Sequence, residues 1–326
     1  MDIRKLNPNG VQFEVMQRSW PRLTGMISDG WQGAVLDLRD RKELYVLQNL
    51  LGAPVVSENG EILYVARDSR RLNCLRSETE IWTSSFLVEY GIENCLGVWN
   101  GTPILELNDS DGSIVAMVDI NRDKLELLFT LPSSAAVVSH TFEFANDVVV
   151  LVAANTGIEI RSVFDGTCKV VVGDFIDYLP KSRLRVVKTA TAGGTFLVEF
   201  LDEFNRSCIL FEHETTDPAS WAYNSLETYL GFSADRSLLY RLHDRTLLTD
   251  LGRYARFRGD PTGSTVASLQ AGNLGIIELG TGKATALGYF GKNQFGTVQF
   301  SPDCQSLILD SRGLIFEEFD WKVVDL

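Results

Sequence analysis

One pattern recurs eight times along this sequence of 326 residues and constrains its fold more than any other feature. Each copy opens with a short turn rich in Gly, Asn, Asp or Arg and continues as an alternating apolar strand. A repeat of roughly 40 residues that carries strands is typical of a β-propeller, in which each repeat forms one blade. The sequence therefore predicts an all-β fold of four-stranded antiparallel blades. The clearest copies are Asp111–Ile114, Asn155–Ile158, Asn273–Ile276 and Ser311–Leu314.

Each repeat divides into two halves of two strands. The first half is an apolar strand, a turn and a second strand. Pro, Asp, Asn and Gly gather in its turn because these residues pre-set or tolerate the dihedral angles of turns. The second half is the strand described above, followed by an outer strand. The best first halves are Val298–Leu309, Leu230–Tyr240 and Val55–Val65, and the expected outer strands are Lys283–Tyr289, Lys124–Leu131 and Cys168–Val172.

Counting the third strands of the repeats predicts the number of blades. Seven blades are the alternative to eight, if the N-terminal unit merges with the C-terminal one. Val11–Val15 would then pair with the last blade, which would remove exposed strand edges. The count itself is eight, with third strands expected near Gly33, Leu72, Gly112, Gly157, Arg206, Arg245, Gly275 and Gly313.

Three further expectations concern the organisation of the chain. The repeat between Asp235 and Thr262 is short, so we expect it to lack its outer strand. A helix over Thr215–Glu227 is possible on the sequence, although Asp217-Pro218 could equally begin a long loop. No linker interrupts the pattern, which favours a single domain over residues 1–326.

Two segments carry a resemblance to a known family. FSPDCQSLILDSRGLIFEEFD at Phe300–Asp320 and DSDGSIVAMVDI at Asp109–Ile120 are similar to the blades of WD-repeat and YVTN-type propellers. The Trp-Asp and Gly-His pairs of that family are missing, and only Phe164-Asp165 and Phe319-Asp320 approach the former. The resemblance covers about Val11 to Asp320 and implies a degenerate propeller whose blades are held by apolar burial. Most WD-like propellers serve as scaffolds or binding platforms.

Composition narrows the class of protein. The 45% hydrophobic and 22% charged residues are ordinary for a soluble globular chain. No apolar run approaches the ~20 residues that cross a bilayer. The first residues lack the apolar core of a secretory signal, so we expect a cytosolic protein. Five scattered cysteines, an odd number mostly within apolar runs, fit buried free thiols better than disulfides or metal ligands.

The net charge of −13 restricts the partners. Nucleic acid and anionic membranes need a basic surface, so neither is expected as a partner. A basic protein or peptide would be attracted and steered to this chain, although such a charge is also compatible with a soluble surface that implies no partner.

No catalytic or metal-binding pattern is found. His140, His213 and His243 are isolated, and a calcium loop starting at Asp109 would need an acidic ligand where Ile120 stands. The chain has no Gly-x-Ser-x-Gly elbow, and Gly280–Lys283 lacks the first glycine of a phosphate loop. We therefore expect no cofactor, no metal and no catalytic residues.

Two function classes remain. The first is a non-catalytic protein-interaction module, a binding regulator or inhibitor of a protein partner, as bacterial immunity proteins are. The second is a propeller hydrolase or lactonase with its site at the mouth of the central channel. For the first, the candidate interface residues are two tryptophans and a tyrosine expected in turns, with an acidic pair: Trp99, Trp221, Tyr223, Asp202 and Glu203.

Overall fold

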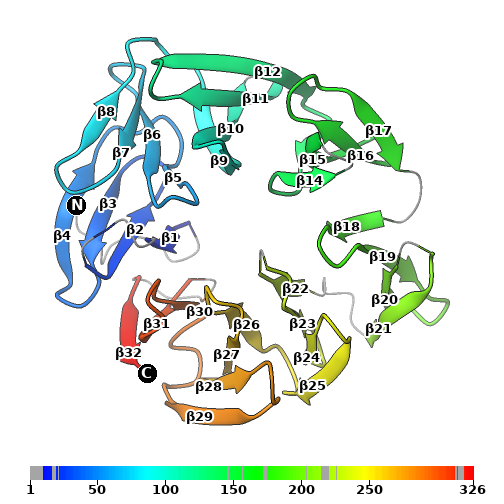
Figure 1. Cartoon of the computed structure of the whole chain (residues 1–326). Coiled ribbons are helices and arrows are strands. Elements are labelled where there is room, and N and C mark those ends of the chain that lie inside the picture. The colour runs from blue at the N-terminus through cyan, green and yellow to red at the C-terminus, as the bar shows by residue number, and fades with distance from the viewer. Residues whose placement is uncertain are drawn as a thin grey trace. The chain divides into compact units, whose positions relative to one another are not determined.

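The structure, a computed structural model, describes residues 10–16, 20, 22–109, 111–144, 147–155, 157–171, 175–202, 204–213, 220–224, 226–312, 314 and 319–326. Eight antiparallel sheets follow one another along this part of the chain, and none of its residues forms a helix. The sheets are the eight blades of a β-propeller, numbered here 1 to 8 in chain order (Figure 1). The prediction of an all-β propeller is thereby confirmed, with eight blades and not seven.

The chain divides into two compact units of four blades each, Met1–Gly173 and Asp174–Leu326. In the first unit, consecutive strands of each blade pair antiparallel, except that β13 and β14 both pair with β15. Blade 1 contains β1 Gln12–Val15, β2 Thr24–Ser28, β3 Gly33–Asp37 and β4 Lys42–Leu47; blade 2 contains β5 Val55–Val56, β6 Ile62–Ala66, β7 Arg71–Leu75 and β8 Ile81–Thr83; blade 3 contains β9 Gly91–Trp99, β10 Thr102–Asp109, β11 Gly112–Asp119 and β12 Lys124–Pro132; blade 4 contains β13 Ala136–Val137, β14 Phe142–Phe144, β15 Asp147–Ala154, β16 Gly157–Ser162 and β17 Cys168–Val171.

The second unit repeats the same order of pairing. Its last blade shows three strands in the part of the chain that the structure describes. Blade 5 contains β18 Phe175–Leu179, β19 Leu184–Ala190, β20 Phe196–Leu201 and β21 Ser207–His213; blade 6 contains β22 Ser220–Tyr223, β23 Tyr229–Ser233, β24 Leu238–Arg241 and β25 Thr246–Asp250; blade 7 contains β26 Arg256–Gly259, β27 Thr265–Gln270, β28 Asn273–Glu278 and β29 Ala284–Tyr289; blade 8 contains β30 Thr297–Phe300, β31 Ser306–Asp310 and β32 Trp321–Asp325.

An aspartate closes the turn between the third and fourth strands in several blades. Its carboxylate accepts the backbone N–H of the residue two positions later, which satisfies a donor that the turn leaves unpaired. The approximate Trp-Asp match at Phe164-Asp165 falls on one of these turns. The residues are Asp37, Asp119, Asp165, Asp202 and Asp244, in blades 1, 3, 4, 5 and 6.

Five of the outer strands share a second feature, a β-bulge. One extra residue on the outer strand interrupts its register with the third strand, which bends the edge and makes indiscriminate strand pairing less favourable. The bulged residues are Leu44, Leu128, Cys208, Leu248 and Leu287, in blades 1, 3, 5, 6 and 7.

Apolar contact between neighbouring blades forms the core within each unit. In the first unit, separate clusters of buried side chains join blades 1 and 2, blades 2 and 3, and blades 3 and 4. In the second unit, equivalent clusters join blades 5 and 6, blades 6 and 7, and blades 7 and 8. This arrangement confirms that apolar burial between sheets holds the blades, as the missing Trp-Asp pairs imply.

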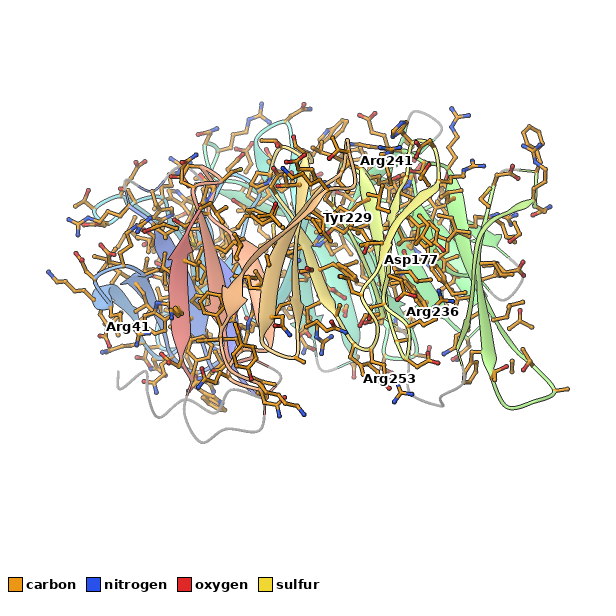
Figure 2. All side chains as sticks on the ribbon, turned by 90° about the horizontal axis from the view of Figure 1, so that it is seen from below. Arg41, Asp177, Tyr229, Arg236, Arg241 and Arg253 are labelled. Atoms are coloured by element: carbon orange, nitrogen blue, oxygen red, sulfur yellow. The ribbon has the colours of Figure 1, made fainter. Side chains whose placement is uncertain are left out.

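Blades 6 and 7 fit together through two glycines that face aromatic rings. A Cβ atom on Gly231 of β23 would lie 2.6 Å from Phe257 Cδ2, and one on Gly259 of β26 would lie 2.5 Å from Tyr229 Cε1. The hydroxyl of Tyr229, which is marked in Figure 2, accepts the backbone N–H of Gly259 at 2.9 Å. Each ring occupies the space that a side chain on the opposite glycine would fill, so the two strands approach closely.

In the seven-blade alternative Val11–Val15 would pair with the last blade, but β1 pairs with β2 of its own blade. Two expectations about strands are wrong. Blade 6 has its outer strand, β25, and is short because its strands have only four or five residues and are joined by short connections. The strands after Arg206 and Arg245 are the outer strands β21 and β25, because an apolar strand after a polar turn looks the same in either position.

The other outcomes concern the segment for which a helix or a long loop was possible, and the thiols. Within Thr215–Glu227, residues Ser220–Tyr223 form strand β22, while 215–219 and 225 lie outside the described residues. Gly313 also lies outside them. All five cysteines are free thiols, and Cys74 and Cys95 are buried, but Cys168 is exposed.

Candidate functional site

Trp99 is the last residue of β9 and precedes the turn at Asn100, which has a φ of 50°. Its ring makes an edge contact with Phe164, with 5.8 Å between the ring centroids, and packs against the core between blades 3 and 4. The tryptophan is half-buried. It therefore lies beside a turn, as expected, but much of its surface is used in packing the blades.

Trp221 and Tyr223 lie in strand β22 and not in a turn. Residues two apart in a strand share a face, and both side chains pack against the core between blades 5 and 6. The Trp221 ring makes an edge contact with Phe200. Both residues were expected in a turn near Asp217-Pro218, but the alternation of Trp, Ala and Tyr is that of a strand.

The half-buried carboxylate of Asp177 holds the Trp221 ring in place. The indole N–H donates to Asp177 Oδ2 at 2.8 Å, and the backbone N–H of Tyr178 donates to Asp177 Oδ1 at 2.8 Å. Burial raises the pKa of Asp177 above its ordinary value of 3.8, although both hydrogen bonds oppose this shift. Burial also raises the pKa of Tyr223, and the charge on Asp177 adds to the effect. Asp177 is labelled in Figure 2.

This environment makes stability depend on pH in a defined direction. Because the folded-state pKa of Asp177 is raised, the folded chain binds its proton more tightly than the unfolded chain does. Its contribution to the free energy of unfolding therefore falls as the pH rises from about 4 to the raised folded pKa. Asp177→Asn cannot ionise, so the stability of D177N relative to wild type is expected to improve as the pH rises through this window.

Urea denaturation of both proteins across this pH range measures the effect. Trp221→Phe is the companion variant: it removes the indole donor and is expected to lower the free energy of unfolding by about 2 kcal/mol. A difference between D177N and wild type that is constant with pH would show that Asp177 does not titrate as described.

The carboxylate of Asp202 caps the turn in which this residue lies. It is buried, and its carboxylate accepts the backbone N–H groups of Phe204 and Arg206, both at 2.9 Å, and the Arg206 side chain at 2.7 Å. The backbone N–H of Arg206, with the smaller effects of its side chain and of Phe204, holds the pKa of Asp202 below its ordinary value. Glu203 lies outside the described residues.

Trp31 is not among the candidate residues predicted from the sequence, but 64% of its surface is exposed. It lies in the turn between β2 and β3, and the Arg67 guanidinium stacks on its ring, 4.4 Å from the centroid. Sequence position alone does not distinguish an exposed tryptophan in a turn from a half-buried one, such as Trp99.

An apolar groove lies between blades 2 and 3 of the first unit. Its volume is about 460 Å³, and it is lined by Phe86–Tyr90, which connects β8 to β9, and by Asp123, Lys124, Leu125 and Leu127 at the start of β12. Leu87 and Leu127 have 64% and 53% of their surfaces exposed. Exposed leucines that share a groove are the kind of apolar surface that protein partners cover.

The connection that forms one wall of this groove is held by specific hydrogen bonds. The backbone N–H of Ser85 donates to both carboxylate oxygens of Asp123, each at 3.0 Å. The backbone N–H of Val88, a buried residue, donates to the carbonyl of Arg70 at 2.6 Å. The Arg70 guanidinium donates to the Glu89 carbonyl at 3.2 Å. Leu87 is thus exposed on a segment that is fixed on both sides of it.

Acidic groups outnumber basic ones among the residues that line the groove, by two to one. Exposed Glu89 and half-buried Asp123 line it, and the single lining base, Lys124, is paired with Glu126 at 3.4 Å. The groove therefore combines apolar walls with an acidic rim, in a chain whose net charge is −13.

Two further findings concern classes of site. Among the residues with described positions, no three His, Cys, Asp or Glu side chains gather in a group that could hold a metal ion. The same part of the chain contains no helix that is long and apolar enough to cross a membrane.

Comparison with known proteins supports the fold. No family model matches the chain, and no curated protein matches its sequence. Among solved structures, the C-terminal WD40 domain of Sif2 has a TM-score of 0.58 at 10% identity, over 99% of this chain and 97% of that one. The Dos1 propeller has a TM-score of 0.56 at 11% identity, over 97% and 93% of the two chains. BamB from Moraxella catarrhalis has a TM-score of 0.52 at 10% identity, over 97% and 98%.

The class of protein is therefore a β-propeller whose solved neighbours include WD40 domains. At these identities the similarities show the fold alone.

Proposed function

We propose that this chain is a non-catalytic protein-interaction module that regulates or inhibits a protein partner, and that it binds through the groove between blades 2 and 3. The observation that carries the proposal is the pair of exposed leucines, Leu87 and Leu127, in one apolar groove. Binding energy at protein interfaces is concentrated where a large apolar side chain fills such a depression and water is excluded. The WD-like character of the repeat supports this class, since most propellers of that kind are binding platforms.

The charge of the chain favours a basic partner. A net charge of −13 attracts a basic protein over a Debye length, about 8 Å at physiological ionic strength. The acidic rim of the groove, with Glu89 and Asp123, would meet basic groups on the partner at short range. An inhibitor of a basic toxin domain, similar in role to an immunity protein, fits this combination.

A binding measurement at two ionic strengths tests the proposal. Affinity purification from the native cell followed by mass spectrometry supplies the candidates, and a set of basic and neutral proteins of similar size supplies the comparison. We expect the basic partner to bind preferentially at low salt, with association slowed by about tenfold or more at high salt. Equal binding of basic and neutral proteins at low salt would contradict the proposal.

We also propose that the protein acts in the cytosol. The proposal depends on the five free thiols, since disulfides are the usual state of paired cysteines in oxidising compartments. Fractionation of native cells followed by immunodetection tests it, and recovery of the protein from a secreted or membrane fraction would contradict it.

A further inference from the structure

The groove adjoins a free strand edge. β12 is the terminal strand of blade 3 and pairs only with β11 among the strands that the structure describes. Its Lys124, Glu126, Leu127 and Thr130 are exposed. An unpaired strand edge presents a row of backbone N–H and C=O groups to any extended segment that comes close.

β12 differs from the other outer strands that have a bulge in the length of regular strand before that bulge. Lys124–Leu127, four residues, precede the bulged Leu128. Only two residues of β4 or β25, and three of β29, precede the equivalent bulges. A bulge interrupts strand pairing, so among the bulged outer strands β12 offers the longest regular stretch before its bulge. The outer strands β17 and β32 pair over four and five residues with no register shift, and β12 is singled out by the groove beside it.

The side chains of this edge divide between its two faces. Leu125 and Leu127 both line the groove, as residues two apart in a strand should. Glu126 is not among the lining residues, and its carboxylate pairs with the ammonium group of Lys124, at the start of the strand, at 3.4 Å. An added strand would alternate in the same way, so its groove-side residues would meet Leu127 and Leu87.

We propose that the partner binds by strand addition: an extended segment pairs with Lys124–Leu127, places one large apolar side chain between Leu87 and Leu127, and directs a basic side chain to Glu89. This inference rests on the proposed function and names the mode of binding and the chemistry of the segment. The unpaired backbone selects an extended segment, because only a strand can satisfy these groups in a row. The exposed leucines favour a large apolar residue in the bound segment, and the acidic rim of the groove favours a basic residue beside it.

A display library of random linear peptides is the probe. Peptides selected on the full-length chain are expected to carry one large apolar residue with Lys or Arg nearby in a β-prone sequence. Their affinity is expected to fall by about tenfold or more in Leu127→Ser, the usual loss at an anchoring side chain. Leu87→Ser and Glu89→Lys should weaken the same peptides.

Leu247→Ser is the matched control. Leu247 is 45% exposed, lies on the terminal strand β25 and directly precedes the bulged Leu248, as Leu127 precedes Leu128. It belongs to the second unit, so L247S should bind the selected peptides as wild type does. Circular dichroism and urea denaturation of each variant separate a loss of binding from a loss of folding.

Two measurements distinguish strand addition from side-chain docking alone. Hydrogen exchange should show slower exchange at outward-facing amides of Lys124–Leu127 when the peptide is bound. N-methylation of the peptide backbone should abolish binding at alternate positions, because only every second residue directs its N–H towards β12.

The outcomes separate this inference from the proposed function. A basic partner that binds wild type and L127S equally would leave the proposed function intact and overturn strand addition. The inference is also overturned if the library yields no peptide that depends on Leu127, or if such peptides tolerate N-methylation at every position. Failure of any basic protein to bind the wild-type chain would overturn the proposed function itself.

Discussion

Replacing Asp310 with alanine is expected to lower the free energy of unfolding by about 3 to 5 kcal/mol, the usual effect of breaking a buried ion pair from one side. Asp310 ends β31 in blade 8 and is fully buried. The Arg312 side chain donates to its two carboxylate oxygens at 2.8 and 3.0 Å, and the Thr297 hydroxyl donates to Oδ2. Alanine would leave the guanidinium, which is only partly exposed, without its charged partner.

Asp303→Ala is the control for this measurement. Asp303 is an exposed aspartate in the same blade, and its carboxylate accepts the backbone N–H of Gln305 in a turn. Its removal is expected to cost about 1 kcal/mol, as the loss of a turn cap does. Urea denaturation followed by tryptophan fluorescence compares the two variants. Equal losses in D303A and D310A would show that burial of the Asp310 network does not determine its contribution.

Gly231→Ala is expected to lower the free energy of unfolding by about 2 to 3 kcal/mol, as overpacking of a closely packed core does. The new Cβ would lie 2.6, 2.7 and 2.9 Å from Cδ2, Cγ and Cβ of Phe257. A ring can turn about its χ angles, but the Phe257 Cβ is attached to the backbone of β26. Relief of the contact therefore requires a shift between blades 6 and 7, and that shift would disturb the fit of Tyr229 to Gly259.

Two comparisons test this explanation. Gly280→Ala is the control, because a Cβ there would have no atom within 4 Å and its φ is not positive; its effect should stay near zero. In a double-mutant cycle, Phe257→Leu should recover part of the stability lost in G231A, since residues in contact are energetically coupled. Additive losses in the double variant would contradict a steric conflict between these two residues.

The fold could be predicted from the sequence because its signals are local. A turn needs Gly, Asn or Asp at defined positions, and a half-buried strand needs alternation, so each blade leaves the same trace in the chain. The recurrent aspartate between the third and fourth strands, such as Asp165 or Asp244, belongs to this trace. The same locality explains the errors at Arg206 and Arg245. A turn followed by an apolar strand does not state which position in the blade the strand takes.

The candidate site was less accessible to sequence reasoning. Trp221 and Tyr223 pack between blades. The contacts of Trp221 with Asp177 and Phe200 join residues that are distant in the sequence. Asp202 caps a turn by accepting a hydrogen bond from Arg206. The sequence did not indicate Phe86–Tyr90 as a binding site, because an exposed leucine cannot be distinguished from a buried one by sequence alone. The sequence did contain one signal for this site. Phe86, Leu87 and Val88 are three consecutive apolar residues outside an alternating strand pattern, and in such a run one residue can be exposed beside a buried neighbour.

The sequence by itself determined the class of fold, the division into repeats, the turns between strands and the acidic charge of the chain, because short-range sterics and composition decide these properties. Tertiary structure alone decided which apolar residues became core and which stayed exposed. Leu125 packs against the core between blades 2 and 3, whereas Leu127, two residues further on the same strand, has 53% of its surface exposed. The physical reason is that burial depends on the neighbouring blade that covers a side chain, and that neighbour comes from a distant part of the chain.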